Sequence, residues 1–203
     1  MIIISISLIV FALSVAVYFR RFVNRNRIIF VVLGSGGHTS EMFRILMKAD
    51  VPSGHRICFI VGKDDNMSLQ KAKTFCKIKS IPFEYETVIR PRRVHQPILF
   101  AIPTLLLSIC QSVLLVAKHR PSIILTNGPA LCVIIALAGR LLNLSYNNPK
   151  IVYIESFARV YNLSLSGKCM EYLANKFYVQ WPEIQAPKRL LRAQRLFCGG
   201  PLV

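Results

Sequence analysis

The residues best suited to chemistry lie in the segment GSGGHTSE, residues 34–41. Its glycines are Gly34, Gly36 and Gly37. Glycine permits positive φ angles and a close approach of the backbone to a ligand, and Thr39 or Ser40 is expected to cap the helix that follows. A turn of this kind is typical of phosphate binding, because free N–H groups and the positive end of the helix dipole point out of it. For His38 we consider both contact with the ligand and a purely structural position.

The turn does not match the motifs that bind nucleotides. The dinucleotide fingerprint GxGxxG requires a third glycine where Thr39 stands, and the Walker motif is absent. An acid that would bind the ribose of NAD is also missing in its usual place, because Asp64 and Asp65 come only after a Gly-Lys pair. A self-sufficient nucleotide-dependent enzyme, such as a dehydrogenase, is therefore the less favoured alternative.

Two further turns are expected at strand ends of the same sheet. In LTNGPA, Asn127 and Gly128 make a turn, and Pro129 suits the first position of the next helix. In YIESF, Glu155 and Ser156 follow an apolar strand. Because ligands bind at the carboxyl ends of parallel strands, we expect these residues to line the same cleft as the glycine turn. A plain turn at Asn127 and a solvated acid at Glu155 are the structural alternatives.

A cluster of basic residues precedes the apolar stretch 98–117. The segment VIRPRRVHQP holds Arg90, Arg92 and Arg93. Near an anionic membrane surface each basic residue contributes about 1 kcal/mol to binding. We expect these arginines either to hold lipid phosphates at a specific site or to provide general adhesion to the membrane.

Strand-like and helix-like segments alternate from residue 28 onward, which predicts one Rossmann-like α/β domain with a mostly parallel sheet. Strands are expected at residues 27–34, 55–62, 82–89, 122–128, 150–156 and 177–180. The third of these is more polar, so it is expected near an edge. Helices are expected from Glu41 onward, at residues 68–80, 98–117 and 130–144, and around 167–177.

Residues 1–19 contain no charged side chain and predict a transmembrane anchor. As a helix they span about 28 Å, close to the thickness of the hydrocarbon core of a bilayer. Residues 20–27 form a basic juxtamembrane segment that begins with Arg20 and Arg21. Because basic residues stay on the cytosolic side, we expect a lumenal N-terminus, a cytosolic remainder, and Arg20 and Arg21 beside lipid phosphates.

Residues 98–117 are also long and apolar enough to span a membrane, although Pro103 and Gln111 interrupt them. A crossing here would separate the strand at 122–128 from the strand at 27–34, which the alternating pattern places in one sheet. We therefore expect a helix that lies on the sheet and partly enters the membrane interface.

The composition indicates an anionic partner. The 203 residues include 26 Lys and Arg against 9 Asp and Glu, which gives a net charge of +17. No RNP, zinc-finger or basic-zipper pattern accompanies this charge, so phospholipids or phosphorylated substrates are favoured over nucleic acid. The six cysteines show no CxxC spacing and several lie in apolar runs, which predicts buried free thiols and no metal site.

Taken in order, the motifs GSGGHTSEM, RPRR, TNGPALC, IVYIESFARV, LSLSGK, YVQWPE and GGPLV resemble one family. It is the membrane-anchoring subunit of the eukaryotic N-acetylglucosaminyltransferase that adds the second sugar to dolichol-linked oligosaccharide. The chain also resembles the N-terminal, acceptor-side half of the bacterial lipid-II glycosyltransferase, which has a GT-B fold. In that relative a histidine precedes the glutamate near the acceptor, whereas Ile154 precedes Glu155 here.

The resemblance implies a subunit that is not an enzyme on its own. A GT-B enzyme needs two Rossmann-like domains, and one such domain is expected in this chain. UDP-GlcNAc is therefore expected on a separate, small, soluble catalytic subunit, and no cofactor is expected on this chain. The implied location is the cytosolic face of the endoplasmic reticulum membrane and the contiguous nuclear envelope. The implied ligand is GlcNAc-diphosphate-dolichol, and the transferase that adds the first sugar is a possible further partner.

The resemblance also assigns roles to residues of the domain at 28–187 and of the tail at 188–203. The acceptor diphosphate is expected at Gly34, Gly36, Gly37, Thr39, Asn127, Gly128 and Ser156. His38 or Glu155 is expected to act as the general base on the acceptor hydroxyl. The tail is expected to dock the partner through Leu190, Leu191, Leu196, Phe197 and Leu202. A pure scaffold with vestigial loops is the remaining alternative.

Overall fold

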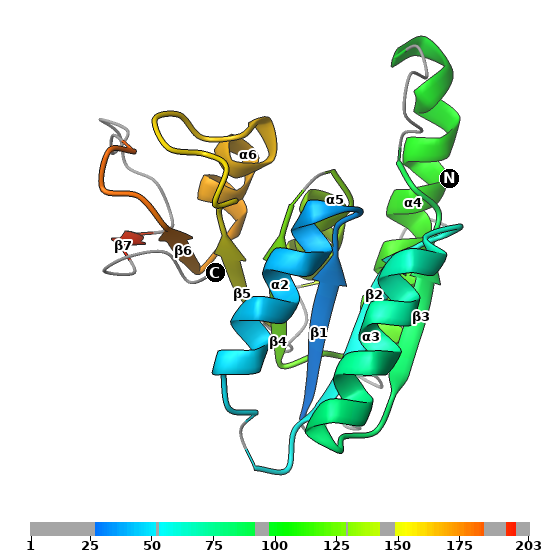
Figure 1. Cartoon of the computed structure of the whole chain (residues 1–203). Coiled ribbons are helices and arrows are strands. Elements are labelled where there is room, and N and C mark those ends of the chain that lie inside the picture. Colours follow the sequence, from blue (N-terminus) through cyan, green and yellow to red (C-terminus); the bar gives the residue numbers. More distant parts are fainter. Residues whose placement is uncertain are drawn as a thin grey trace, which may run out of the picture.

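A parallel β-sheet forms the centre of the molecule (Figure 1). The computed structural model describes residues 27–51, 53–91, 98–128, 130–142, 149–184 and 194–197. Within this part of the chain the sheet has seven strands in the order β3-β2-β1-β4-β5-β6-β7, and every neighbouring pair is parallel. The strands are β1 Ile28–Leu33, β2 Arg56–Gly62, β3 Glu84–Val88, β4 Ile123–Asn127, β5 Lys150–Ile154, β6 Lys176–Val179 and β7 Gln194–Phe197. The prediction of a mostly parallel Rossmann-like sheet is confirmed.

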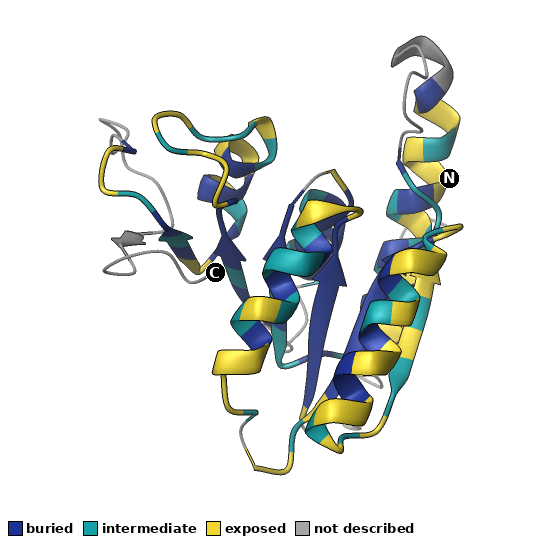
Figure 2. Ribbon diagram, in the orientation of Figure 1, coloured by how far each residue is buried: buried dark blue, intermediate teal, exposed yellow. Residues whose placement is uncertain are grey.

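Helices cover both faces of the sheet. They are α2 Gly37–Lys48, α3 Asn66–Lys79, α4 Ile98–His119, α5 Ala130–Leu141 and α6 Leu165–Leu173. Alternate residues of β1 belong to two different apolar clusters, one with α2 and α3 and the other with α4, α5 and α6. The central strands are therefore buried from both sides (Figure 2), as their continuous apolar runs predict.

The chain differs from the sequence prediction at both ends of the domain. Helix α2 begins at Gly37 instead of Glu41, so His38 and Thr39 belong to its first turn. Strand β7 is not predicted by the sequence pattern, and it places residues 194–197 of the expected tail in the sheet, beside β6. The backbone of two expected docking residues, Leu196 and Phe197, is thus part of the edge strand.

Several predicted sites lie outside the described residues. They are the anchor at residues 1–19, Arg20, Arg21, Arg92, Arg93, Leu190, Leu191 and Leu202. Among the described cysteines, Cys58, Cys76 and Cys132 are buried free thiols as predicted, whereas Cys110 and Cys169 are exposed. Burial raises the pKa of the Cys58 thiol to about 12, so it stays protonated.

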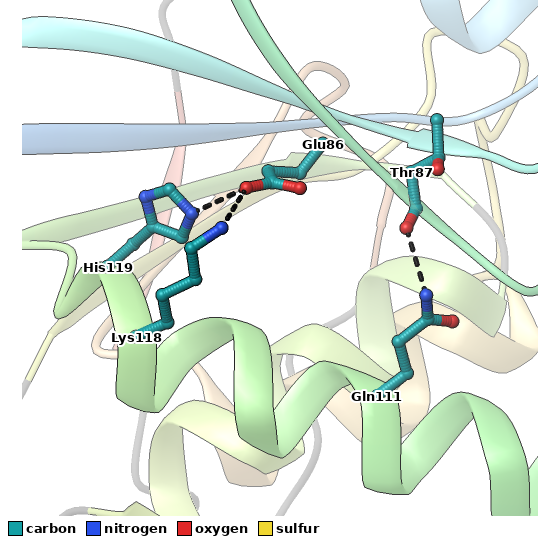
Figure 3. Close-up of polar contacts among 5 residues, drawn as sticks. All are labelled: Glu86, Thr87, Gln111, Lys118 and His119. Atoms are coloured by element: carbon teal, nitrogen blue, oxygen red, sulfur yellow. Dashed lines mark hydrogen bonds and ion pairs between the residues drawn. The ribbon is translucent and has the colours of Figure 1, made fainter.

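Helix α4 is fastened along the edge strand β3 by polar contacts (Figure 3). The Gln111 side chain donates to the Thr87 carbonyl over 3.2 Å and accepts from the Ile89 N–H over 2.9 Å. It thereby satisfies backbone groups that an edge strand otherwise leaves unpaired. Nearer the end of the helix, Lys118 and His119 contact Glu86 over 2.9 and 2.7 Å. The structure therefore places α4 on the sheet, as expected.

The outer face of α4 is apolar. Its exposed large side chains are Ile102, Leu105, Leu106, Leu107 and Leu114. Within the described residues, Ala101–His119 is the one helix that is long and apolar enough to cross a membrane by length and composition. Because its inner face is fixed to β3, the exposed leucines form a stripe that faces away from the domain core.

Replacing Glu86 by Gln is expected to reduce stability at neutral pH and to have no such effect in strong acid. The hydrogen bond from Lys118, with further help from His119, lowers the pKa of Glu86 below its usual 4.5. A carboxylate whose pKa is lower in the folded chain adds stability above the unfolded-state pKa and loses it as pH falls through the folded-state pKa. We expect a loss of about 0.2–1 kcal/mol in Glu86→Gln near neutral pH. Thermal unfolding against pH measures it.

The matched control for this prediction is Glu183→Gln, which removes an exposed carboxylate from the loop after β6. It should leave the difference from wild type flat across the acidic range. A Glu86→Gln difference that persisted unchanged below the folded-state pKa would show that charge is not the cause.

Candidate functional site

Three loops that carry the predicted site residues leave neighbouring strands at the same edge of the sheet. Strand β4 pairs with β1 on one side and with β5 on the other. Leu33 lies opposite Asn127, and Thr126 lies opposite Tyr153, so the carboxyl ends of the three strands lie level with one another. Ligands of open α/β sheets bind at this edge.

The glycine turn after β1 leaves the start of α2 uncapped. Gly36 occupies the N-cap position with φ 68°, and no side chain hydrogen-bonds to the cap. The prediction that Thr39 or Ser40 caps this helix is therefore wrong. A Cβ atom added at Gly36 or Gly37 would meet nothing within 4 Å, and both residues are exposed. The turn thus presents free backbone N–H groups and the positive end of α2 to an open space.

Thr39 holds this turn together from inside the domain. Its side chain is buried, and its hydroxyl donates to the Gly34 carbonyl. The same oxygen lies 2.8 Å from the Ser68 hydroxyl at the start of α3. Because the Thr39 proton is already used, Ser68 is the donor in that pair. Thr39 therefore shapes the turn, and its side chain does not reach the open space where we expect the acceptor.

His38 lies against the turn after β4. Its Nδ1 atom is 3.2 Å from Oδ1 of Asn127, which is fully buried. Gly128 has φ 127°, and a Cβ atom there would lie 3.0 Å from Cγ of His38. The hydrogen bond with Asn127 thus holds the imidazole, and the absence of a side chain at Gly128 leaves room for it. The expectation that these three residues come together agrees with the structure.

Glu41 joins the second turn to the third, and the sequence pattern does not single it out. Asn127 donates through Nδ2 to Oε2 of Glu41 over 3.2 Å, and Ser156 donates through Oγ to Oε1 over 2.9 Å. The sequence could nevertheless have indicated Glu41, because a residue three positions after His38 lies on the same face of α2. This relation is missed when α2 is expected to begin at Glu41, because His38 then lies outside the helix.

Glu155 is buried beneath the third loop. The residue is 1% exposed. Its carboxylate accepts hydrogen bonds from the N–H and hydroxyl of Ser164, from the Ser156 N–H and from the Tyr153 hydroxyl. Burial, together with the nearby Glu155, raises the pKa of Tyr153 far above its usual value, so its hydroxyl remains a donor.

These contacts give Glu155 a structural role, because they fix the loop that leads to Ser164, the N-cap of α6. A general base must come within hydrogen-bonding distance of the substrate. The position of the Glu155 carboxylate does not favour that function, so of the two predicted bases only His38 is a candidate.

Arg90 lies at the end of β3 and is already partly engaged. Its guanidinium is 3.1 Å from the Asp65 carboxylate. It also packs over Gly62, where a Cβ atom would lie 2.9 Å from its Nε. The Arg90 side chain therefore contacts the loop after β2 on one side. Its contact with lipid phosphate stays a prediction.

Comparisons with known proteins identify relatives of this chain. Curated relatives named "UDP-N-acetylglucosamine transferase subunit ALG14" are 41% identical in Candida albicans, over 76% of this chain and 70% of the relative, and 39% identical in Schizosaccharomyces pombe, over 76% and 75%. A rat relative with the same name is 35% identical over 76% of each chain.

Among solved structures, Acinetobacter baumannii MurG superposes with a TM-score of 0.56 at 12% identity, over 84% of this chain and 44% of that one. At such low identity the match shows a shared fold. The family model described as "Oligosaccharide biosynthesis protein Alg14 like" matches residues 29–196, which span β1 to β7. The chain therefore belongs to the Alg14-like family of oligosaccharide biosynthesis proteins.

Proposed function

We propose that this chain is the membrane-bound, acceptor-side subunit of a heteromeric UDP-GlcNAc transferase that extends dolichol-linked oligosaccharide on the cytosolic face of the endoplasmic reticulum. The name shared by its relatives, transferase subunit, supports the subunit role. The observation that carries the acceptor role is the open, uncapped start of α2 beside His38.

The turn after β1 is suited to the acceptor diphosphate. Diphosphate oxygens accept hydrogen bonds from backbone N–H groups, and an anion is favoured at the positive end of a helix. Gly36 and Gly37 leave room for such a group, since neither position has an atom near its missing Cβ. UDP-GlcNAc then approaches from the partner subunit, which supplies the other side of the cleft.

The proposed reaction is a glycosyl transfer with a single base on this chain. His38 takes the proton from a hydroxyl of the acceptor GlcNAc, and the hydroxyl oxygen forms a bond to C1 of the donor sugar. The bond from C1 to the donor diphosphate breaks, and UDP leaves with the bonding electrons. General-base catalysis of this kind contributes about 10²–10⁴-fold to the rate.

Replacing Gly37 by Ala is expected to weaken acceptor binding and leave the fold intact. Gly37 starts α2, its φ is not positive, and the space around it is open, so a methyl group fits the free chain. That methyl group would lie where we place the diphosphate. Loss of one charge-assisted hydrogen bond should raise the acceptor KM about tenfold or more. Steady-state kinetics of the complex measure this, with thermal unfolding alongside.

Arg44→Ala, on an exposed position of the same helix, is the control and should leave the acceptor KM unchanged. An unchanged KM in Gly37→Ala would place the diphosphate elsewhere.

The exposed stripe of α4 is expected to touch the bilayer. We expect a polarity-sensitive dye on Cys110, which is exposed on α4, to be quenched by lipid-attached quenchers when the full chain is in liposomes. The labelled chain also carries Cys169→Ser and Cys198→Ser, so that the dye does not attach at these two positions. Adding Leu106→Asp and Leu107→Asp should reduce the quenching, because charged side chains are costly to place in the apolar part of a bilayer. Equal quenching before and after these changes would contradict the contact.

The experiment that tests the proposed function compares the purified chain alone with the chain co-expressed with its soluble partner. Sugar transfer from UDP-GlcNAc to a GlcNAc-diphosphate-lipid acceptor should require both chains. Full activity of the chain alone would refute the subunit proposal.

A further inference from the structure

A continuous series of hydrogen bonds links the ends of β1, β4 and β5. It runs from the Ser156 hydroxyl to the Glu41 carboxylate, from Glu41 to the Asn127 amide, and from Asn127 to the His38 ring. The three distances are 2.9, 3.2 and 3.2 Å. Asn127 is fully buried, Ser156 is buried, and Glu41 and His38 are half-buried. The series therefore begins inside the domain and ends beside the open turn.

The direction of each hydrogen bond follows from chemistry. The Asn127 amide donates through Nδ2 to Oε2 of Glu41, so its NH₂ group is turned toward Glu41. Its carbonyl oxygen, Oδ1, then faces His38, where it can only accept. The Nδ1 atom of His38 therefore carries the proton, and in the neutral ring the lone pair is on Nε2.

We infer that Glu41 is a positioning residue, which fixes the Asn127 amide and through it holds His38 in the tautomer with a basic Nε2. This inference rests on the proposed role of His38 as the base. Without Glu41, the amide can rotate by half a turn and offer its NH₂ group to Nδ1. The ring proton then moves to Nε2, and no lone pair is left for the acceptor hydroxyl. Gly128 leaves room for the ring in either state, so the tautomer can change without a shift of the ring.

Replacing Glu41 is expected to lower kcat. In a Ser-His-Asp triad, losing the group that selects the histidine tautomer lowers kcat by about 10⁴-fold. Here the group acts through an amide, so we expect Glu41→Met to lower kcat of the complex about 10- to 100-fold, with the acceptor KM within about twofold. Glu41→Gln should recover most of the rate, because its Oε1 can still accept from Asn127 while its NH₂ group faces Ser156.

A double-mutant cycle separates positioning from a merely structural role. If Glu41 acts only through His38, then His38→Gln combined with Glu41→Met is no slower than His38→Gln alone. Losses that multiply would overturn the inference. Glu84→Gln, at the amino end of β3 and on the opposite edge of the sheet, removes a comparable acid and should keep wild-type kcat.

If Glu41→Met does not accumulate, a variant that moves the carboxylate from position 41 to position 127 tests the same inference. The double variant Asn127→Asp, Glu41→Gln places the carboxylate directly on Nδ1 of His38 and keeps a donor behind it. We expect it to retain activity within about tenfold of wild type, because a carboxylate on Nδ1 also leaves the lone pair on Nε2. A folded but inactive exchange variant would overturn the inference.

These outcomes distinguish the inference from the proposed function. If His38→Gln has wild-type kcat, the base role fails, and the inference fails with it. If His38→Gln is slow and Glu41→Met has wild-type kcat, the base role stands and only the inference is overturned.

Discussion

Replacing His38 by Gln is expected to lower kcat of the assembled transferase about 10²–10⁴-fold, because it removes the group that we propose as the base for the acceptor hydroxyl. The acceptor KM should change little, since we propose that backbone groups of the turn bind the diphosphate. Gln keeps a polar group near Asn127, so the fold should also be kept. Steady-state kinetics with varied acceptor, together with the melting temperature of the chain, provide the measurement.

His55→Gln is the matched control, because it changes a histidine that lies just before β2, at the opposite end of the strands. It should retain wild-type kcat. If His38→Gln were as active as the control, the base would have to come from the partner subunit, and this chain would contribute binding alone.

Replacing Gly128 by Ala is expected to lower both stability and activity. At φ 127° a residue with a side chain is strained, at a cost of about 1–3 kcal/mol. The new methyl group would also lie 3.0 Å from Cγ and 3.2 Å from Cβ of His38, which pushes the ring away from Asn127. We therefore expect a lower melting temperature and a fall in kcat that approaches that of His38→Gln.

The comparison with Gly37→Ala makes this prediction specific. Both changes add one methyl group at the same edge of the sheet, but only Gly128 has a positive φ and a neighbour in the way. Gly128→Ala should therefore affect kcat and melting temperature, and Gly37→Ala the acceptor KM. Wild-type kcat in Gly128→Ala would mean that the His38 position is not important for the reaction.

The sequence predicts six of the seven described strands, because β1, β2, β4 and β5 are rich in Ile, Val, Phe and Leu and all six lie between turn residues. It also predicts the polar character of edge strand β3, where side chains alternate between half-buried and exposed. Strand β7 escapes prediction because its sequence, Gln-Arg-Leu-Phe, is short and half polar, and only pairing with β6 makes it a strand.

The site is predictable in part. His38, Asn127 and Gly128 follow from the rule that ligands bind at the carboxyl ends of parallel strands. The partners of Glu41 do not follow from any local pattern, because Asn127 and Ser156 are 86 and 115 residues away in the chain. Glu155 shows the opposite case, where an acid at a strand end is buried by a loop that the sequence alone does not place.

We propose that this chain carries the acceptor side of a divided active site. Equilibrium binding to the purified full chain, without its partner, tests it most directly, with GlcNAc-diphosphate-lipid and UDP-GlcNAc as the two ligands in detergent micelles. We predict saturable binding of the lipid diphosphate, weakened by Gly37→Ala and by competing inorganic diphosphate, and no binding of UDP-GlcNAc. Saturable binding of UDP-GlcNAc without binding of the lipid diphosphate would contradict it.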